Sequence, residues 1–252
     1  MKPFEHVDAG SLEEALSLLR KYGGKGCVMA GGTDLLGVLK DRILQDYPEV
    51  LINLKTIRAM EAVEKTPEGL RIGALAKLAD LASSGLVQGR YPALSQAAES
   101  VASPEIRNMG TIGGNLCQDV RCWYYRYPHH MGGRMLCLRK GTGPCHAVTG
   151  DNRYHAIFGA KKCFAVCPSD TAIALSALRA EIEVVGEKGS RTIPVEAFFT
   201  PLGKALETGE LVKEVRIPNP PAGCRQAFLK FTERRPIDFA VASVAAALQM
   251  QD

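Results

Sequence analysis

The sequence predicts a protein of mixed helices and strands, and three observations support this class. Apolar residues with helical spacing alternate with short apolar runs typical of strands, and glycine-rich turns separate the two. The chain has 252 residues, of which 46% are hydrophobic and 23% charged, as is ordinary for a globular protein with a substantial core. The net charge of +4 is small and evenly spread, so nucleic-acid binding is not expected.

The first fifty-odd residues predict a compact α/β unit. Its first helix begins at the capping box Ser11-Leu-Glu-Glu14 and ends at Gly23. The elements expected after it are a strand at 27–30, the turn Gly31-Gly-Thr-Asp34, a helix at 35–42 and a strand at 49–53.

The remaining residues predict further strands and helices on both sides of one irregular segment. Periodicity disappears between Asn115 and Asn152, and so long a loop inside a compact domain is either functional or disordered. The best candidate for a domain boundary is the cluster Pro218, Pro220 and Pro221. The expected strands are 69–73, 181–185, 210–217 and 226–231; the expected helices are 75–82, 92–102 (ending at Pro104) and 170–180; a small-residue apolar element covers 240–248.

Nothing in the sequence predicts export or a membrane span. The N-terminus is polar and lacks the apolar core of a signal peptide. The longest apolar run, 239–248, is far shorter than the roughly 20 residues that cross a bilayer. We therefore expect a cytoplasmic protein with no membrane partner, with export alongside a signal-bearing partner as the alternative. In the cytoplasm, eight cysteines indicate buried thiols or metal ligands rather than disulfides.

Two glycine-rich runs are candidate anion cradles. Ala30-Gly-Gly-Thr-Asp34 lies between a strand and a helix, where unpaired backbone N–H groups can receive a pyrophosphate. Gly110-Thr-Ile-Gly-Gly-Asn115 offers the same chemistry without a following helix. Each is a weak signal alone, because a glycine turn without a ligand is commoner. Neither matches the dinucleotide fingerprint G-x-G-x-x-G, and no P-loop is present.

Four cysteines, Cys122, Cys137, Cys145 and Cys163, punctuate the irregular segment. Their spacings, C-x14-C, C-x7-C and C-x17-C, match neither zinc ribbons nor ferredoxins. Spacing alone therefore leaves scattered structural thiols as an equal alternative. The polar and aromatic surroundings favour a metal site instead. Four thiolates on an irregular loop can close around a [4Fe–4S] cluster, and zinc is chemically permitted too.

The other cysteines and the histidines are weaker candidates. Cys27 lies in an apolar strand and is expected in the core, and Cys224 has no evident partner. Cys117 and Cys167 lie close enough to replace one of the four. His146 and His155 are ordinary polar residues that could donate hydrogen bonds to cluster sulfurs. No catalytic acid–base pair or nucleophile arrangement is recognisable.

These segments together resemble a known family. Met29-Ala-Gly-Gly-Thr-Asp-Leu-Leu36, Arg107-Asn-Met-Gly-Thr-Ile-Gly-Gly-Asn-Leu116 and Pro168-Ser-Asp170 resemble the flavin-binding medium subunit of molybdenum hydroxylases, the xanthine dehydrogenase and carbon monoxide dehydrogenase group. Arg121-Cys-Trp-Tyr-Tyr-Arg126 and Thr149–Gly159 are similar to the members with an extra [4Fe–4S] cluster, such as 4-hydroxybenzoyl-CoA reductase and periplasmic aldehyde oxidoreductases.

The resemblance implies an α+β fold of the PCMH type (vanillyl-alcohol-oxidase-like), with FAD between two α/β subdomains. The implied subdomains are 1–56 and 57–220, the second carrying the iron–sulfur loop 117–163. The implied third part, 221–252, is only the start of a C-terminal α+β domain, so a truncated or split subunit is expected. Its apolar surface near 239–248 would need a partner.

The resemblance also implies the cofactor-binding and metal-binding residues. In the reductase-type pattern the fourth cluster ligand falls near Tyr154, which cannot replace a thiolate, so we assign it to Cys163, with Cys167, Cys117 and His155 as alternatives. The implied FAD-binding residues are Ala30, Gly31, Gly32, Thr33, Asp34 and Leu35 for the pyrophosphate and Thr111, Gly113, Gly114 and Asn115 for the rest of the cofactor. Asp170 would bind it from the Pro-Ser-Asp turn, Val212 would line the flavin, and Lys230 would lie near the isoalloxazine edge. The implied cluster ligands are Cys122, Cys137, Cys145 and Cys163.

The implied function is electron transfer within a complex, presumed heterohexameric, in which molybdopterin lies in a large subunit and [2Fe–2S] clusters in a small one. Electrons would reach FAD here and pass to NAD⁺ or another acceptor. The alternatives are a zinc-stabilised interaction module, the flavoprotein subunit of a 4-hydroxybenzoyl-CoA reductase type of reductase, and a self-sufficient flavin oxidoreductase. The last is disfavoured because no acid–base pair or covalent flavin anchor is recognisable. Neither the substrate nor the acceptor is encoded in recognisable residues.

Overall fold

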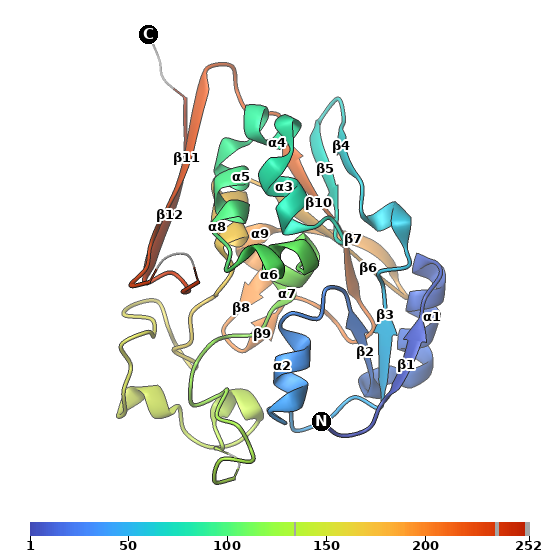
Figure 1. Ribbon diagram of the computed structural model, residues 1–252, viewed down its shortest axis with the longest axis vertical. Helices are drawn as coiled ribbons and strands as arrows, with labels where there is room; N and C mark the ends of the chain where they lie inside the picture. The colour runs from blue at the N-terminus through green and yellow to red at the C-terminus, as the bar shows by residue number, and fades with distance from the viewer. Residues whose placement is uncertain (134, 235–236, 250–252) are drawn as a thin grey trace.

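The computed structural model describes residues 1–133, 135–234 and 237–249. Parts of the expected third domain, 235–236 and 250–252, lie outside these ranges. The described chain forms a small parallel sheet at its N-terminus, a larger antiparallel sheet in its second part, a helical layer beside that sheet and a C-terminal hairpin (Figure 1). No helix of the described residues is long and apolar enough to cross a bilayer.

The N-terminal part is a three-stranded parallel sheet of order β1-β3-β2, formed by β1 (Glu5–Asp8), β3 (Val50–Asn53) and β2 (Gly26–Met29). Two helices, α1 (Leu12–Tyr22) and α2 (Leu35–Lys40), lie on opposite sides of it (Figure 1). The expected capping box begins α1, because the Ser11 hydroxyl accepts the N–H of Glu14 at 3.1 Å and the Glu14 carboxylate accepts the N–H of Gly10 at 2.7 Å.

The second part is built on a five-stranded antiparallel sheet of order β4-β5-β10-β6-β7. A short hairpin, β8 and β9, and a long one, β11 and β12, complete the strands. The strand bounds are β4 Val63–Lys65, β5 Gly69–Gly73, β6 Glu181–Gly186, β7 Gly189–Pro194, β8 Phe199–Thr200, β9 Gly203–Lys204, β10 Leu211–Pro218, β11 Cys224–Phe231 and β12 Ala242–Gln249.

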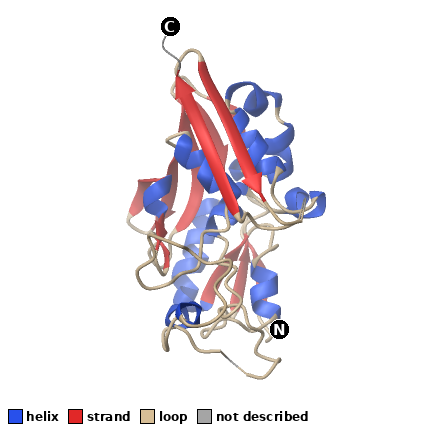
Figure 2. Cartoon of the chain, turned by 90° about the vertical axis from the view of Figure 1, so that its left-hand side faces the viewer, coloured by secondary structure: helices blue, strands red, loops and turns tan. Residues whose placement is uncertain are grey.

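Helices from the middle of the chain cover this sheet, and β11 packs on α5 while β12 packs on α8 (Figure 2). One apolar core runs through both parts, from Ile52 in β3 to Ile182 in β6 and Phe198 in α9. The helix bounds are α3 Leu78–Ser83, α4 Gly85–Arg90, α5 Pro92–Glu99, α6 Pro104–Met109, α7 Ile112–Cys117, α8 Asp170–Ala177 and α9 Val195–Phe198.

The mixed fold and every strand and helix expected from the sequence are present, with ends shifted by a few residues. Two expectations were wrong in detail. Pro104 does not end a helix but occupies the first turn of α6, where its missing N–H costs nothing. The second glycine run does contain a helix, α7, which begins after Thr111.

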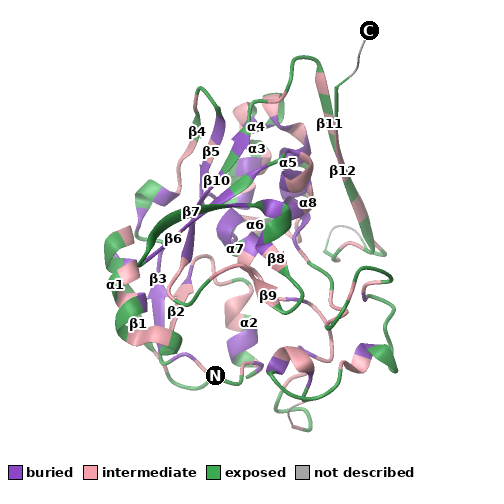
Figure 3. Cartoon of the chain, turned by 180° about the vertical axis from the view of Figure 1, so that it is seen from behind, coloured by how far each residue is buried: buried purple, intermediate pink, exposed green. Residues whose placement is uncertain are grey.

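The irregular segment expected after Asn115 also has the predicted character. Between α7 and α8 its helical structure among the described residues is two single 3₁₀ turns, Leu138–Lys140 and His146–Val148. Figure 3 shows this segment mostly exposed or half-buried, at the side of the molecule next to α2. The conformation of this segment therefore depends on side-chain contacts rather than on the regular backbone hydrogen bonds of helices and strands.

Candidate functional site

A cavity of about 790 Å³ lies where the parallel sheet, the helical layer and the irregular segment meet. This volume is in the range of small-molecule and cofactor sites. We call it the glycine-turn cavity. Both glycine runs line it, together with 74–75, 202–204, 206 and 210–212. Of the cofactor residues expected from the sequence, it brings together Ala30, Gly31, Gly32, Thr33, Asp34, Leu35, Thr111, Gly113, Gly114, Asn115 and Val212.

The first glycine turn leaves backbone donors available. Among the described residues, the N–H groups of Gly31 through Asp34 have no backbone or side-chain acceptor. Gly32 has φ +70°, a left-handed conformation that favours glycine. A Cβ atom on Gly31 would lie 2.0 Å from the carbonyl oxygen of Met109, so only glycine allows this turn to approach the end of α6. These unpaired donors fit the diphosphate of a dinucleotide.

The second glycine run has a different local structure. The N–H groups of Ile112 and Gly113 donate to the carbonyl oxygens of Ala76 and Ala74, and that of Gly114 donates to the Thr111 hydroxyl at 3.1 Å. A Cβ atom on Gly113 would lie 2.8 Å from Ala74. This run therefore forms a closely packed wall of the cavity, and the amides of Ile112, Gly113 and Gly114 are already paired within the protein.

Asn115, expected to contact the cofactor, also holds α7 against α8. Its side-chain oxygen accepts hydrogen bonds from the Ser169 hydroxyl at 2.5 Å and from the Thr171 hydroxyl at 2.7 Å. Ser169 in turn caps α8 by accepting the N–H of Ala172 at 3.1 Å. The Pro-Ser-Asp turn is thus joined directly to the second glycine run.

Asp170 and Lys230 do not line the cavity. They form a buried ion pair with 2.7 Å between Nζ and Oδ2, and the two side chains are 7% and 8% exposed. Lys230 also donates to the carbonyl oxygen of Ser100 at 3.1 Å. Burial raises the pKa of Asp170, and the adjacent Lys230 offsets only part of this effect. The pair fastens the β11–β12 hairpin to α8.

Four cationic side chains line the glycine-turn cavity, and three of them are paired with carboxylates. Arg121 and Arg126 contact Asp34, and Arg139 contacts Asp119. Lys204, in β9, has no ion pair or hydrogen bond of its ammonium group with any residue that the structure describes. Sequence reasoning missed Lys204 because a single lysine in a two-residue strand carries no motif.

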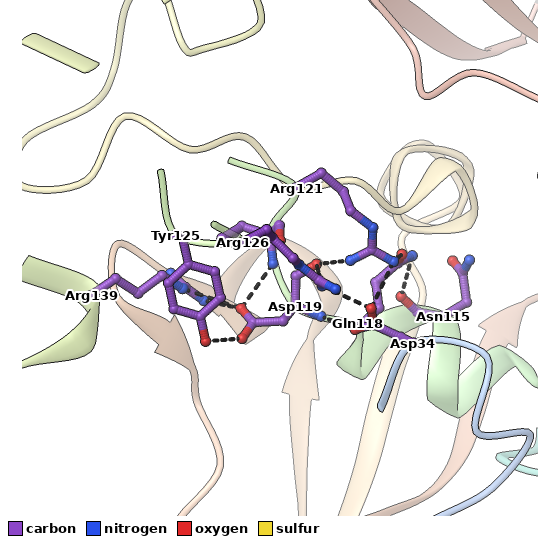
Figure 4. A network of polar contacts seen from close by, with 9 residues as sticks. Asp34, Asn115, Gln118, Asp119, Arg121, Tyr125, Arg126 and Arg139 are labelled. Atoms are coloured by element: carbon purple, nitrogen blue, oxygen red, sulfur yellow. Dashed lines mark hydrogen bonds and ion pairs between the residues drawn. The ribbon is translucent and has the colours of Figure 1, made fainter. Parts of the chain in front are cut away.

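The irregular segment meets the first glycine turn through a network of polar contacts (Figure 4). The carboxylate of Asp34 accepts hydrogen bonds from Arg126 at 2.8 Å and from the backbone N–H of Asp119 at 2.7 Å. The carboxylate of Asp119 accepts hydrogen bonds from Tyr125 at 2.5 Å and from Arg139 at 3.0 Å.

This network stabilises the carboxylate of Asp119 in the charged form. Burial alone would raise the pKa of Asp119, but the Tyr125 hydroxyl and the Arg139 guanidinium outweigh it, so this pKa lies below its ordinary value. The same burial raises the pKa of Tyr125, which remains a hydrogen-bond donor. Through their hydrogen bonds, Asp34 and Asp119 connect segments that lie far apart in the chain.

A second, smaller cavity lies inside the irregular segment, and we call it the cysteine cavity. Cys122, Cys137, Cys145 and Cys163, the four expected ligands, all line it. Of the alternatives, Cys117 lines the glycine-turn cavity instead, and Cys167 is exposed and lines neither. Tyr125 and Arg139 line both cavities, so they form a shared wall between them.

The four thiols line one cavity but do not converge on a single point. Among the described residues, no three His, Cys, Asp or Glu side chains lie together closely enough to hold a single metal ion. A polynuclear cluster needs a wider spacing, since its thiolates bind different iron atoms. Burial raises the pKa of Cys122, with smaller contributions in the same direction from Cys163 and Cys137. Four thiols that line one cavity have the ligand number and type of a [4Fe–4S] cluster.

His155 and an aromatic group lie beside the cysteine cavity. His155 is 8% exposed, and its Nε2 lies 3.2 Å from the sulfur of Cys122. Its ring packs at 5.6 Å from Trp123 and 6.1 Å from Tyr124, measured between ring centroids. Burial lowers the pKa of His155, which favours the neutral ring. The structure thus places His155 beside a candidate ligand, as a hydrogen-bonding neighbour.

Comparison with protein families assigns the chain to a family. Residues 2–220 match the family described as "FAD binding domain in molybdopterin dehydrogenase". The chain belongs to this family. The PCMH-type fold and the membership of the molybdenum hydroxylase medium subunits, both expected from the resemblance, are confirmed.

Individual relatives agree with this assignment. The FAD-binding subunit PaoB of the aldehyde oxidoreductase of Escherichia coli is 38% identical over 255 residues, which cover 98% of this chain and 77% of PaoB. The carbon monoxide dehydrogenase medium chain of Hydrogenophaga pseudoflava is 29% identical over 249 residues, covering 98% of this chain and 69% of the relative. A solved structure of carbon monoxide dehydrogenase from that organism superposes with a TM-score of 0.75 at 26% identity, covering all of this chain and 71% of its own.

Proposed function

We propose that this chain is the FAD-binding electron-transfer subunit of a molybdenum-dependent hydroxylase or dehydrogenase complex, of the subtype with an additional [4Fe–4S] cluster. The observation that carries the proposal is the shared wall: a dinucleotide-sized cavity and a cavity lined by four cysteines have Tyr125 and Arg139 in common. Two redox groups this close together are suited to passing electrons from one to the other. Family membership supports the FAD, and the four thiols support the cluster.

In this proposal the residues of the glycine-turn cavity bind and orient FAD. The unpaired N–H groups of Gly31 to Asp34 receive the diphosphate, and the wall at 111–115 and Val212 enclose the rest. Lys204 adds a positive charge to the cavity, and its ammonium group forms no ion pair with any residue that the structure describes. Asp34 acts through its arginines rather than on the cofactor, since its carboxylate already accepts three donors. Asp170 and Lys230 act on the cofactor site indirectly, because their ion pair fixes the position of β11.

The four cysteines hold the cluster in the same proposal, with Cys163 as the fourth ligand. FAD exchanges electrons in pairs or singly and an iron–sulfur cluster one at a time, so the two groups can join a two-electron oxidation to one-electron carriers. This chain's own contribution is to keep both groups apart from bulk water and at fixed separation. The protein surroundings also tune both potentials.

The partners remain part of the proposal. A large subunit with molybdopterin would oxidise the substrate, and a small subunit with [2Fe–2S] clusters would deliver electrons, in a heterohexamer that passes them to NAD⁺ or another acceptor. The division into 1–56, 57–220 and 221–252, and the cytoplasmic location, likewise stay predictions from the sequence.

Purification tests the proposal. The chain, isolated without oxygen, is expected to carry about one FAD and about four irons with acid-labile sulfide. A variant with Cys122, Cys137, Cys145 and Cys163 replaced by serine is the matched control, expected to keep flavin and lose iron. A wild-type chain that takes up neither FAD nor iron contradicts the proposal, and one zinc with no iron points to the interaction module.

A further inference from the structure

The contacts of Asp34 and Asp119 join the two cavities mechanically. Asp34 follows the glycine turn directly and stands at the start of α2. Its carboxylate is 17% exposed and accepts from Arg121, Arg126 and the N–H of Asp119, all three from the irregular segment. The glycine turn is therefore fastened to residues that lie 85 to 92 positions further along the chain.

The opposite end of the network belongs to the cysteine cavity. Asp119 accepts from Tyr125, three residues after Cys122, and from Arg139, two residues after Cys137. Arg139 is only 9% exposed, so its pairing with Asp119 is screened little by water. Figure 4 shows Arg139 and Tyr125 on one side of Asp119 and Asp34 on the other.

The conformational order of this network is expected to depend on Cys122 and Cys137. The segment has no backbone ladder among its described residues apart from two single 3₁₀ turns. Fixing Cys122 and Cys137 around one group therefore removes conformational freedom from Tyr125 and Arg139, and through them from Asp119. A ligand that binds an already ordered site avoids the entropic cost of ordering it.

We propose that the path from Asp34 through Asp119 to Tyr125 and Arg139 couples the two sites, so that occupation of the cysteine cavity strengthens FAD binding in the glycine-turn cavity. The inference rests on the proposed function and goes beyond it, since it assigns Asp34 and Asp119 as positioning residues for the cofactor rather than as its ligands. Linkage requires the coupling to be reciprocal, so bound FAD also raises the affinity of the cysteine cavity for its metal group by the same factor.

The test compares FAD dissociation constants in two states of the full chain, with iron bound and after iron removal by a chelator. Couplings between protein sites are typically about 5- to 150-fold, and we expect the dissociation constant of the wild type to rise by about tenfold on iron removal. In Asp119→Asn this ratio is expected to fall to about one, because the amide cannot hold both donors as a carboxylate does. Asp151→Asn is the matched control: Asp151 lies in the same segment, outside the network, and the ratio is expected to stay at the wild-type value.

A second variant keeps the inference testable if Asp119→Asn does not fold. Tyr125→Phe retains the ring and removes one hydrogen bond to Asp119, and its ratio is expected to fall between those of the wild type and Asp119→Asn. Equal dissociation constants with and without iron in the wild type overturn the coupling while leaving the proposed function intact. An unchanged ratio in both network variants also overturns it. A wild type that binds FAD but never iron overturns both the cluster assignment and the coupling.

Discussion

Two neighbouring cavities of this chain are held by different means. The glycine-turn cavity is bounded by strands and helices, and its second glycine run is fixed by backbone hydrogen bonds to Ala74 and Ala76. The cysteine cavity lies in a segment whose contacts are ion pairs, aromatic packing and single turns. The first is formed by the strands and helices of the fold, whereas the second depends on the few side chains that fasten it and, in our proposal, on the cluster that it binds. Substitutions in the two regions should therefore fail in different ways.

The largest effect is expected in the cysteine cavity. Cys163→Ser removes one of four thiolates, so iron is expected to fall from about four atoms per chain to near zero, because an incomplete ligand set leaves an iron open to solvent. Iron analysis after anaerobic purification measures this. Cys167→Ser, four residues away and exposed, is the matched control and is expected to keep its iron. Unchanged iron in Cys163→Ser would remove this residue from the site.

The next largest effect distinguishes two roles of Lys230, anchoring the β11–β12 hairpin or contacting the cofactor. Lys230→Met leaves the Asp170 carboxylate buried without its ion pair, which is expected to lower the free energy of unfolding by about 3–5 kcal/mol. Urea denaturation of the FAD-free chain measures this. Asp238→Asn removes a partner from an exposed pair with Arg234 and should leave stability nearly unchanged. If Lys230→Met instead weakens FAD binding and leaves the stability of the FAD-free chain unchanged, Lys230 contacts the cofactor directly.

The glycine turn offers a smaller but sharper test. Gly32→Ala forces a Cβ into a left-handed conformation, which is expected to cost about 1–2 kcal/mol. Since 1.4 kcal/mol corresponds to a factor of ten, FAD affinity is expected to fall by about tenfold when the turn relaxes. A fluorescence titration with FAD measures it. Gly24→Ala, at a glycine with open space around it and outside the cavity, should bind FAD as the wild type does.

Lys204 is expected to give the smallest effect. Lys204→Gln removes one charge from the cavity, and a hydrogen bond to a charged group contributes about 1.5 kcal/mol at the lower end, so FAD should bind up to about tenfold more weakly. Raising the salt concentration should shrink the difference from the wild type. Lys65→Gln, at an exposed position of β4 outside the cavity, is the control. Identical FAD affinity in Lys204→Gln would place the cofactor away from β9.

Sequence patterns predicted the structural features that neighbouring residues determine and missed those formed by residues far apart in the chain. The strand and helix patterns, the glycine turn and the four cysteines are all short signals, and the structure places those residues as elements or around cavities. β1 was missed because Glu5-His-Val-Asp8 is polar and is a strand only through its pairing with β3. β7 was missed because five of its six residues are exposed at the sheet edge.

The network between the cavities could not have been predicted. Asp34 and Asp119 show no pairing pattern in the sequence, because their partners are chosen by the packing of the irregular segment against α2. For the same reason, the pairing of Asp170 with Lys230 could not be read from residues 60 positions apart. The paired amides of the second glycine run depend on Ala74 and Ala76, which belong to another segment.

The central claim is that one chain holds a dinucleotide on the first glycine turn and a cluster among four cysteines across a shared wall. A crystal structure of the chain purified with its cofactors, with anomalous diffraction recorded at the iron edge, tests it most directly. The account predicts FAD phosphates within hydrogen-bonding distance of the N–H groups of Gly31 to Asp34, and an iron peak bounded by Cys122, Cys137, Cys145 and Cys163. FAD bound elsewhere, or four thiols with no iron between them, would contradict it.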